Sequence, residues 1–263
     1  MMQFTHSLEP RGWLLGGLVA VVFLALSYGL ARGRSRPWVR TLCGFLRFTA
    51  IAGLVLCLLE PQWVEKAVHP RRARLAVLGM MISQATMVGT MTLTPLHMKE
   101  GGQTNTAISI MLFSHILGMY ALSPFIGSLT DRVGRYPMLI TAGVLCVIGA
   151  TWAGMTPSDG FIGVTGGLTV VGLAWCFGII ASSGLLTESF PVNQRASVQG
   201  AGDLCMAGFG AAAGISAGAI VAARSYHDLN LAAAGLGILL IVGVFATMAG
   251  ERRRPAPGAV ATA

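Results

Sequence analysis

Charged side chains are scarce in this sequence. Asp, Glu, Lys and Arg make up 11% of its 263 residues, whereas soluble domains carry about 25%. This shortage excludes a soluble enzyme. Hydrophobic residues make up 54%, and glycine, which is more frequent in membrane helices than in soluble ones, occurs 35 times. The composition therefore predicts a bundle of membrane-spanning helices.

The motifs of enzymes and of metal sites are missing as well. The sequence has no Ser/His/Asp set, HExxH motif or paired-carboxylate arrangement, so we do not expect an enzyme. Its glycine-rich runs lack the Lys-Ser that follows a phosphate loop. The cysteines lack the close spacing of a metal site, and we interpret them as buried hydrophobic residues: Cys43, Cys57, Cys146, Cys176 and Cys205. We therefore expect no metal and no cofactor.

The net charge of +8 does not indicate a nucleic-acid partner. The Lys and Arg residues lie in short blocks between apolar runs, and this arrangement is typical of proteins that are oriented in a membrane. The apolar runs themselves are informative, because a helix needs about 20 mostly apolar residues to cross a bilayer. Stretches of this kind begin near Gly12, Thr41, Leu75, Thr106, Pro137, Phe161, Ser197 and Leu229. We predict an all-α polytopic integral membrane protein with about eight transmembrane helices.

Residues 1–70 form the predicted N-terminal membrane-anchor region, with two candidate helices. The first, Gly12 to Ala31, lacks the cleavage site of a signal peptide, so we interpret it as an anchor helix. The second, Thr41 to Leu59, carries Arg47, and a charge at mid-bilayer costs about 2.5 to 3.5 kcal/mol. Two placements of this segment stay open, across the membrane or in its interface, and so does the side of the N-terminus.

The loops between the last six stretches divide their basic residues unevenly. If the stretch from Leu75 starts on the cytoplasmic side, the outer loops hold only Lys99 and Arg224. The inner segments then hold Lys66, Arg71, Arg72, Arg74, Arg132, Arg135, Arg195 and Arg252 to Arg254. The positive-inside rule therefore predicts six spans with both ends in the cytoplasm, followed by a disordered tail at residues 251–263.

One loop between two of these stretches carries a specific motif, Gly127-Ser-Leu-Thr-Asp131-Arg132-Val-Gly134-Arg135. The glycines suit a tight turn, Asp131 can accept from the amides at a helix N-terminus, and the arginines can hold a carboxylate. The segment resembles the signature of major facilitator transporters, which lies in the cytoplasmic loop after the second helix of a six-helix half. The resemblance implies that these charged residues and glycines form a conformational-switch motif.

Further segments extend this resemblance to residues 71–250. They are Thr94-Pro-Leu-His97, Ser123-Pro-Phe-Ile-Gly127 and Leu186-Thr-Glu188-Ser-Phe-Pro191. Alternating spans return Glu188 to the end that carries Arg132 and Arg135, so we expect an ion pair there. Residues 1–70, with Arg36-Pro-Trp-Val-Arg40, are instead similar to the paired N-terminal membrane helices of bacterial proteins that carry a von Willebrand-like domain.

Polar residues within the predicted spans are candidates for a transport pathway, because ionisable groups are rare in membrane helices. Asp203 lies about seven residues into its span and is expected as an unpaired carboxylate that binds a proton or cation. His115 lies about ten residues into its own span and is expected to titrate or to contact substrate. Gln84 and Thr90 belong to a polar stripe that lines either a cavity or a helix contact. For His115 and Asp203 the alternative is likewise packing against a neighbouring helix.

The function that the resemblance implies is secondary transport of a small molecule by alternating access, in the bacterial inner (plasma) membrane. A complete facilitator has two six-helix halves, so activity would need a homodimer or a second chain as partner. The alternative is a non-transporting membrane fragment or scaffold that arose by gene fusion or truncation.

Overall fold

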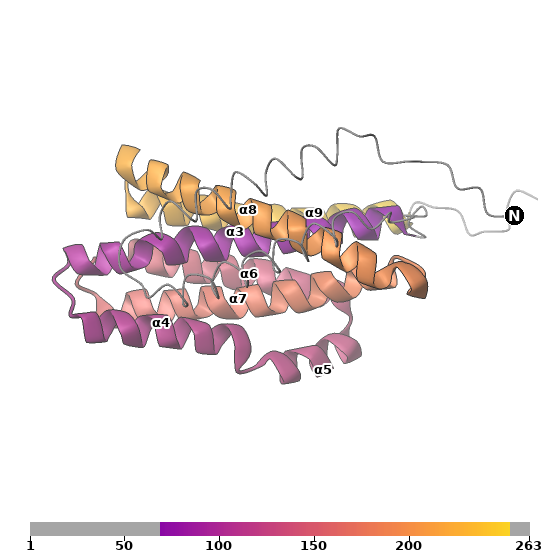
Figure 1. Ribbon diagram of the computed structural model, residues 1–263, viewed down its shortest axis with the longest axis horizontal. Helices are drawn as coiled ribbons and strands as arrows, with labels where there is room; N and C mark the ends of the chain where they lie inside the picture. Colours follow the sequence, from indigo (N-terminus) through magenta and orange to yellow (C-terminus); the bar gives the residue numbers. More distant parts are fainter. Residues whose placement is uncertain (1–68, 253–263) are drawn as a thin grey trace, which may run out of the picture. The chain divides into compact units, whose positions relative to one another are not determined.

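The computed structural model describes residues 69–252, and the regular structure in this part of the chain is entirely helical (Figure 1). The elements are α3 (Pro70–Glu100), α4 (Asn105–Tyr120), α5 (Ser123–Val133), α6 (Arg135–Met155), α7 (Phe161–Glu188), η1 (Val192–Gln194), α8 (Arg195–Ala223) and α9 (Tyr226–Arg252). The predicted spans at Gly12 to Ala31 and Thr41 to Leu59 lie outside the described residues.

Six segments of the described part are long and apolar enough to cross a membrane, with mean hydropathies between 1.4 and 2.4. Helices α4 and α5 together form one of them, Asn105–Val133. These segments correspond to the six spans predicted from Leu75 onward. The chain is therefore a multi-pass membrane protein whose described part is all-helical, and the two further predicted spans stay predictions.

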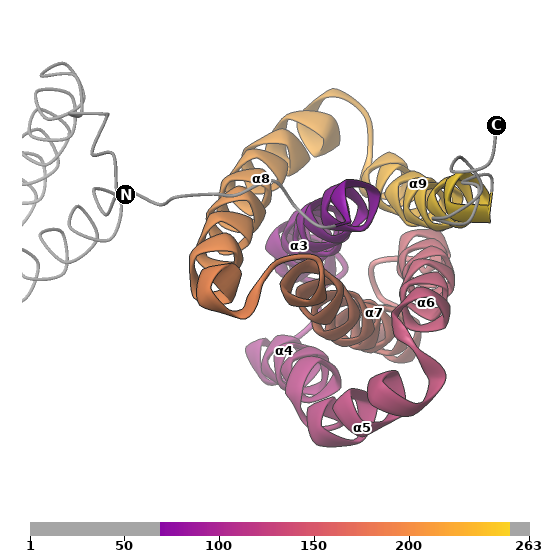
Figure 2. The same ribbon diagram turned by 90° about the vertical axis from the view of Figure 1, so that its right-hand side faces the viewer.

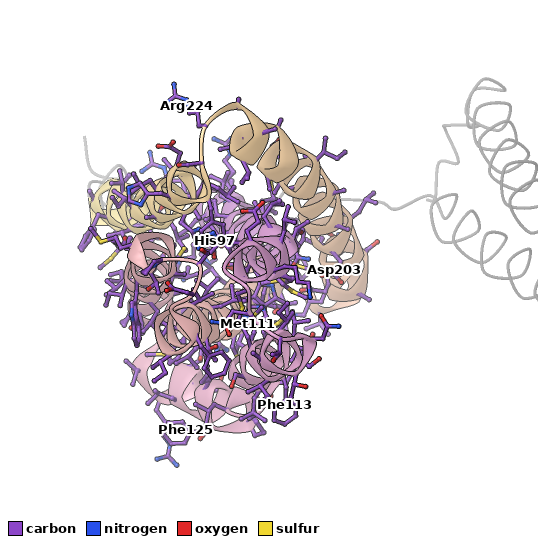
Figure 3. All side chains as sticks on the ribbon, turned by 90° about the vertical axis from the view of Figure 1, so that its left-hand side faces the viewer. His97, Met111, Phe113, Phe125, Asp203 and Arg224 are labelled. Atoms are coloured by element: carbon purple, nitrogen blue, oxygen red, sulfur yellow. The ribbon has the colours of Figure 1, made fainter. Side chains whose placement is uncertain are left out.

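Helices α3 and α7 form the centre of the bundle (Figure 2). Helix α3 packs against α7, α8 and α9, and α7 packs against α4 and α6. The apolar window of α3 is 61% buried, whereas that of α8 is 11% buried. Helices α4, α5 and α8 therefore lie at the periphery. Their large apolar side chains point outward, as Phe113 and Phe125 do in Figure 3, which suits contact with lipid or with another protein.

Glycines allow the central helices to approach closely. A Cβ atom added at Gly167 of α7 would lie 2.5 Å from the backbone nitrogen of Ala153 in α6. The sequence also predicts a close helix contact at Gly210, Gly214 and Gly218, which are spaced four residues apart on one side of a helix. Only the first of these three is tightly packed, because a Cβ at Gly210 would lie 2.8 Å from Gln84, whereas one at Gly218 would have no neighbour within 4 Å.

The helix ends that carry most of the charge meet at one end of the bundle. Arg72 at the start of α3 donates to Glu251 in the last turn of α9, and the Tyr136 hydroxyl at the start of α6 donates to the same carboxylate. The sequence predicts that the loop with Asp131 and the C-terminal end of the last span share a side of the membrane. These contacts confirm that they share an end of the bundle, which we call the charged end.

Candidate functional site

The turn between α5 and α6 is built on Gly134. Its φ of 100° lies in the region that side chains avoid, and it ends α5 and starts α6 at once. Because the turn is so short, Asp131 in the last turn of α5 and Arg135 in the first turn of α6 lie close together. This is the tight turn that the motif predicts.

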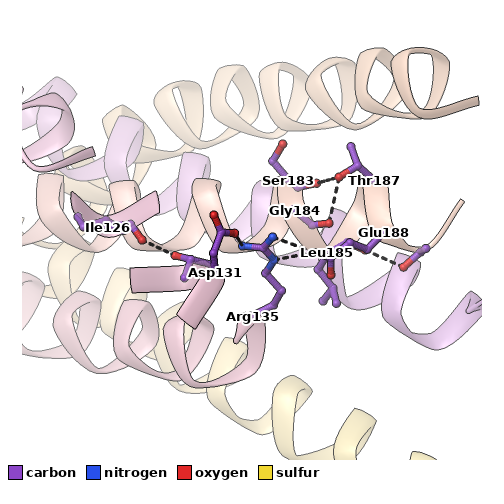
Figure 4. A network of polar contacts seen from close by, with 10 residues as sticks. Ile126, Asp131, Arg135, Ser183, Gly184, Leu185, Thr187 and Glu188 are labelled. Atoms are coloured by element: carbon purple, nitrogen blue, oxygen red, sulfur yellow. Dashed lines mark hydrogen bonds and ion pairs between the residues drawn. The ribbon is translucent and has the colours of Figure 1, made fainter. Parts of the chain in front are cut away.

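Arg135 joins two carboxylates at the charged end (Figure 4). Its Nη1 lies 2.9 Å from Asp131 Oδ1, while its Nη2 and Nε donate to Glu188 Oε1 at 2.8 and 3.1 Å. Glu188 is the last residue of α7, so the pair ties the α5–α6 turn to the end of α7. The predicted contact between Glu188 and an arginine of the motif is confirmed.

The guanidinium group of Arg135 lies against a glycine of α7. A Cβ added at Gly184 would lie 2.8 Å from Arg135 Nε and 2.9 Å from Cζ. Gly184 therefore provides the space in which the arginine reaches Glu188. Gly184 was not among the predicted site residues, although it lies one helical turn before Glu188, on the same face of the helix.

Other parts of the motif differ from the prediction. Gly127 lies inside α5 and not in a turn, and a Cβ added there would have no neighbour within 4 Å. No side chain caps the start of α6, so the prediction that Asp131 caps this neighbouring helix is wrong, and the carboxylate pairs with Arg135 instead. Arg132 is exposed and forms no ion pair within residues 69–252.

A second charged cluster lies at the same end and was not predicted. Arg72 binds both carboxylate oxygens of Glu251, at 2.7 and 3.2 Å, and the hydroxyl of Tyr136 donates to Oε1 at 3.0 Å. The guanidinium carbon of Arg72 lies 5.9 Å from the centre of the Tyr136 ring. This cluster connects α3, α6 and α9, and the sequence placed Glu251 in the tail instead.

His115 lies within the contact between α4 and α7. Its side chain is fully buried, and Nδ1 donates to the carbonyl oxygen of Leu168 at 2.7 Å. Nε2 is buried without a hydrogen-bond partner in the described part of the chain. Gly172 leaves room for the ring, since a Cβ there would lie 3.0 Å from Nδ1. The geometry fits the packing alternative, and a role in transport stays a prediction.

The polar stripe on α3 separates into two parts. Thr90 is fully buried, and its hydroxyl donates to the carbonyl oxygen of Thr86 in the same helix at 2.9 Å. Thr94 is also buried and shares a hydrogen bond with Tyr226 of α9. Thr90 is therefore buried in this structure, which fits the helix-contact alternative, and a role in a transport pathway stays a prediction. Helical spacing alone does not distinguish a stripe that lines a cavity from one that forms a helix contact.

Gln84 lies on a different face of α3, where it is only half-buried. Its Oε1 accepts from Nε1 of Trp175 in α7 at 2.8 Å. The Trp175 ring meets the ring of Tyr120 at the end of α4 edge to face, with centroids 5.7 Å apart. Neither aromatic residue was among the predicted site residues, because aromatic side chains in an apolar span are not distinguished from the other apolar residues by the sequence pattern.

Asp203 lies on the exposed side of α8, and Figure 3 shows it at the edge of the bundle. Its Oδ1 accepts from Gln199 Nε2 at 2.9 Å, and Gln199 Oε1 in turn accepts from Ser183 of α7 at 2.8 Å. Asp203 forms no ion pair within residues 69–252, but the carboxylate does accept a hydrogen bond, which the sequence did not predict. Asp203 is held by an amide that α7 orients.

These groups define one surface, which we call the open face: Gln84, Tyr120, Trp175, Ser183, Gln199 and Asp203. They come from α3, α4, α7 and α8 and form two linked groups. The first group is Gln84, Trp175 and Tyr120, and the second is Ser183, Gln199 and Asp203. Gly210 of α8 packs on Gln84 and lies two helical turns after Asp203, about 10 Å along the helix axis. Across residues 69–252, no three His, Cys, Asp or Glu side chains are placed to hold a metal ion.

Comparison with known proteins identifies related chains. An uncharacterised transporter of the major facilitator type from Bacillus subtilis, YdeG, is 37% identical over 162 residues, which are 62% of this chain and 38% of the relative. A second one from the same organism, YddS, is 34% identical over 162 residues, 62% of this chain and 37% of the relative. The riboflavin transporter RfnT of Brucella anthropi is 30% identical over 158 residues, 59% of this chain and 39% of the relative.

The chain thus spans about two fifths of the length of these relatives. The match to the family as a whole is longer. Residues 75–262 match the sequence pattern of the Major Facilitator Superfamily, which is more than half of the chain and includes all of the elements from α4 to α9. The chain belongs to the Major Facilitator Superfamily.

Proposed function

We propose that this protein moves a small molecule across the bacterial inner (plasma) membrane by alternating access, together with a second six-helix unit. That unit is either another copy of the chain or a partner chain. The observation that carries the proposal is the open face, on which polar side chains from four membrane-spanning helices are exposed or half-buried.

A polar surface at this depth is unfavourable next to lipid. A carboxylate near the bilayer centre costs about 2.5 to 3.5 kcal/mol, and buried polar groups in membrane helices normally face protein or a water-filled cavity. Asp203, Gln199 and Gln84 would each face hydrocarbon if the six helices stood alone. A second unit over the open face removes this cost and encloses a cavity near the midplane, which is where alternating-access transporters bind substrate.

The charged end supplies the conformational switch of this proposal. Arg135 ties the α5–α6 turn to α7 through Asp131 and Glu188. Ion pairs of this kind are stable in one arrangement of the helices and break in another, so they bias a two-state equilibrium. Gly134 permits the turn between α5 and α6, and Gly127 leaves free space beside α5. Arg132 is exposed and is therefore available for contact with a second unit.

Within the pathway, we assign substrate or ion contact to Gln84 and Asp203. His115 is fully buried and supports α4 against α7. Thr90 has no part in the proposal, because it is buried between helices.

The proposal is tested with the full chain, purified and placed in lipid nanodiscs for native mass spectrometry. We expect a dimer or a complex with a co-purified membrane chain. The same preparation in proteoliposomes should show saturable uptake, with riboflavin as the first probe because a relative carries that name. A monomer without a partner, and without uptake of any probe, would support the alternative of a non-transporting fragment or scaffold.

A further inference from the structure

The span formed by α4 and α5 is interrupted in its middle. Helix α4 ends at Tyr120 and α5 begins at Ser123, so the break falls near the centre of the segment Asn105–Val133. Pro124 has no backbone N–H for the carbonyl of Tyr120, and the hydroxyl of Ser123 donates to that oxygen at 2.8 Å instead. Interrupted membrane helices commonly mark a binding site, because they bring backbone and side-chain groups to the midplane.

The break places an aromatic pair on the open face. Tyr120, the last residue of α4, is 56% exposed, and its ring meets that of Trp175 edge to face. Gln84 fixes the Trp175 ring by accepting from its indole N–H. A ring held in this way offers a flat π surface whose orientation does not need to be ordered by a ligand.

The same face carries a negative charge without a basic neighbour. The Lys and Arg residues of the described helices lie near the helix ends, whereas Asp203 is eight residues into α8. No ion pair is formed by Asp203 within residues 69–252, and its hydrogen bond comes from the neutral amide of Gln199. A carboxylate at this depth is stabilised by a positive charge, and the helices of residues 69–252 provide none there.

We propose that the open face recognises a planar organic cation. The flat part of the ligand lies on Trp175 and Tyr120, and its positive charge lies toward Asp203. Gly210, which packs on Gln84, lies about 10 Å along α8 from Asp203, so the ligand extends from the aromatic pair along α8 toward the carboxylate. This substrate class rests on the proposed function, since a second unit must enclose the ligand.

The chemistry selects against other ligands. An anion would meet the carboxylate of Asp203 with no compensating basic group on the open face. A small inorganic cation could reach Asp203 but would leave the flat faces of the aromatic pair uncovered, whereas a planar cation also gains stacking and attraction from the ring quadrupole. A neutral planar molecule would leave Asp203 without a partner.

The test measures equilibrium binding to the full chain in nanodiscs, with three probes. N-methylacridinium is planar and permanently charged, tetraethylammonium is charged but not planar, and riboflavin is planar but neutral. We expect N-methylacridinium to bind at least tenfold more tightly than either of the others. Tighter binding of riboflavin than of N-methylacridinium would overturn the proposal.

Two variants with matched controls locate the site. Asp203→Asn should weaken binding of N-methylacridinium about tenfold, whereas Asp228→Asn, at the opposite end of the bundle from the charged end, should leave it unchanged. Trp175→Leu should weaken binding about fivefold, whereas Trp152→Leu on α6 should not. Circular dichroism and elution volume confirm folding of each variant. Equal binding by Asp203→Asn and wild type would overturn the assignment.

Binding and transport are scored separately. Binding of N-methylacridinium without uptake in proteoliposomes supports the ligand class and contradicts the proposed transport. Uptake of riboflavin without binding of N-methylacridinium supports transport and overturns the ligand class.

Discussion

The contact between Arg135 and Glu188 should contribute more to stability than the contact between Arg135 and Asp131. Two N–H groups of Arg135 reach one oxygen of Glu188, at 2.8 and 3.1 Å, and the two side chains are 21% and 49% exposed. Asp131 receives one N–H group at 2.9 Å and is 69% exposed. Exposed ion pairs contribute about 0.2 to 1 kcal/mol, and pairs four residues apart about 0.3 to 0.5.

We therefore expect a coupling energy of about 1 kcal/mol for Arg135 with Glu188, at the upper end of this range, because the arginine is mostly buried against Gly184. For Arg135 with Asp131 we expect about 0.3 kcal/mol. The more exposed carboxylate is better solvated by water and loses less when its partner is removed.

The assay is a pair of double-mutant cycles on the free energy of unfolding of the full chain in bicelles. The variants are Arg135→Gln, Glu188→Gln, Asp131→Asn and the two doubles. Arg132→Gln is the control, since Arg132 has no ion-pair partner among the described residues, and it should change stability by less than about 0.5 kcal/mol. Equal coupling energies in the two cycles, or a larger one for Asp131, would refute the reasoning.

Three further predictions concern packing and the second cluster. Gly167→Leu should lower the free energy of unfolding by about 3 kcal/mol, because its Cβ would meet the backbone of α6. Gly218→Ala has open space around it and should be neutral or stabilise the protein by up to about 1 kcal/mol. Thermal denaturation measures both effects. Tyr136→Phe should cost about 1 kcal/mol through the lost hydrogen bond to Glu251, and loss of this difference in Glu251→Gln would verify the contact. Thr90→Val should leave uptake in proteoliposomes within about twofold of wild type, since its hydroxyl bonds only to its own helix; a larger loss would return Thr90 to the pathway.

The membrane spans of the described region were predictable from the sequence because apolar runs of about 20 residues have few other uses. The Arg135–Glu188 contact was predictable as well. It follows from counting spans, because alternating helices return to the same end, and from the need of an arginine there for a carboxylate.

The environment of single residues within the spans was not predictable to the same degree. Thr90 and Gln84 belong to the same polar stripe, yet one is buried between helices and the other lies on the open face. Which side of a helix faces a neighbour depends on contacts between segments far apart in the sequence. The cluster of Arg72 with Glu251 likewise depends on tertiary structure, whereas the break after Tyr120 has a local cause in Pro124.

The claim that the open face borders a water-filled path is tested most directly by cysteine accessibility in membranes. In a chain whose native cysteines are replaced by serine, we introduce Gln84→Cys or Gln199→Cys on the open face, and Phe245→Cys on the outward side of α9 as control. A membrane-impermeant maleimide should label the first two positions and not the control, because thiols react only where water reaches them. Absence of labelling at Gln84→Cys and Gln199→Cys, or equal labelling at all three positions, would contradict the account.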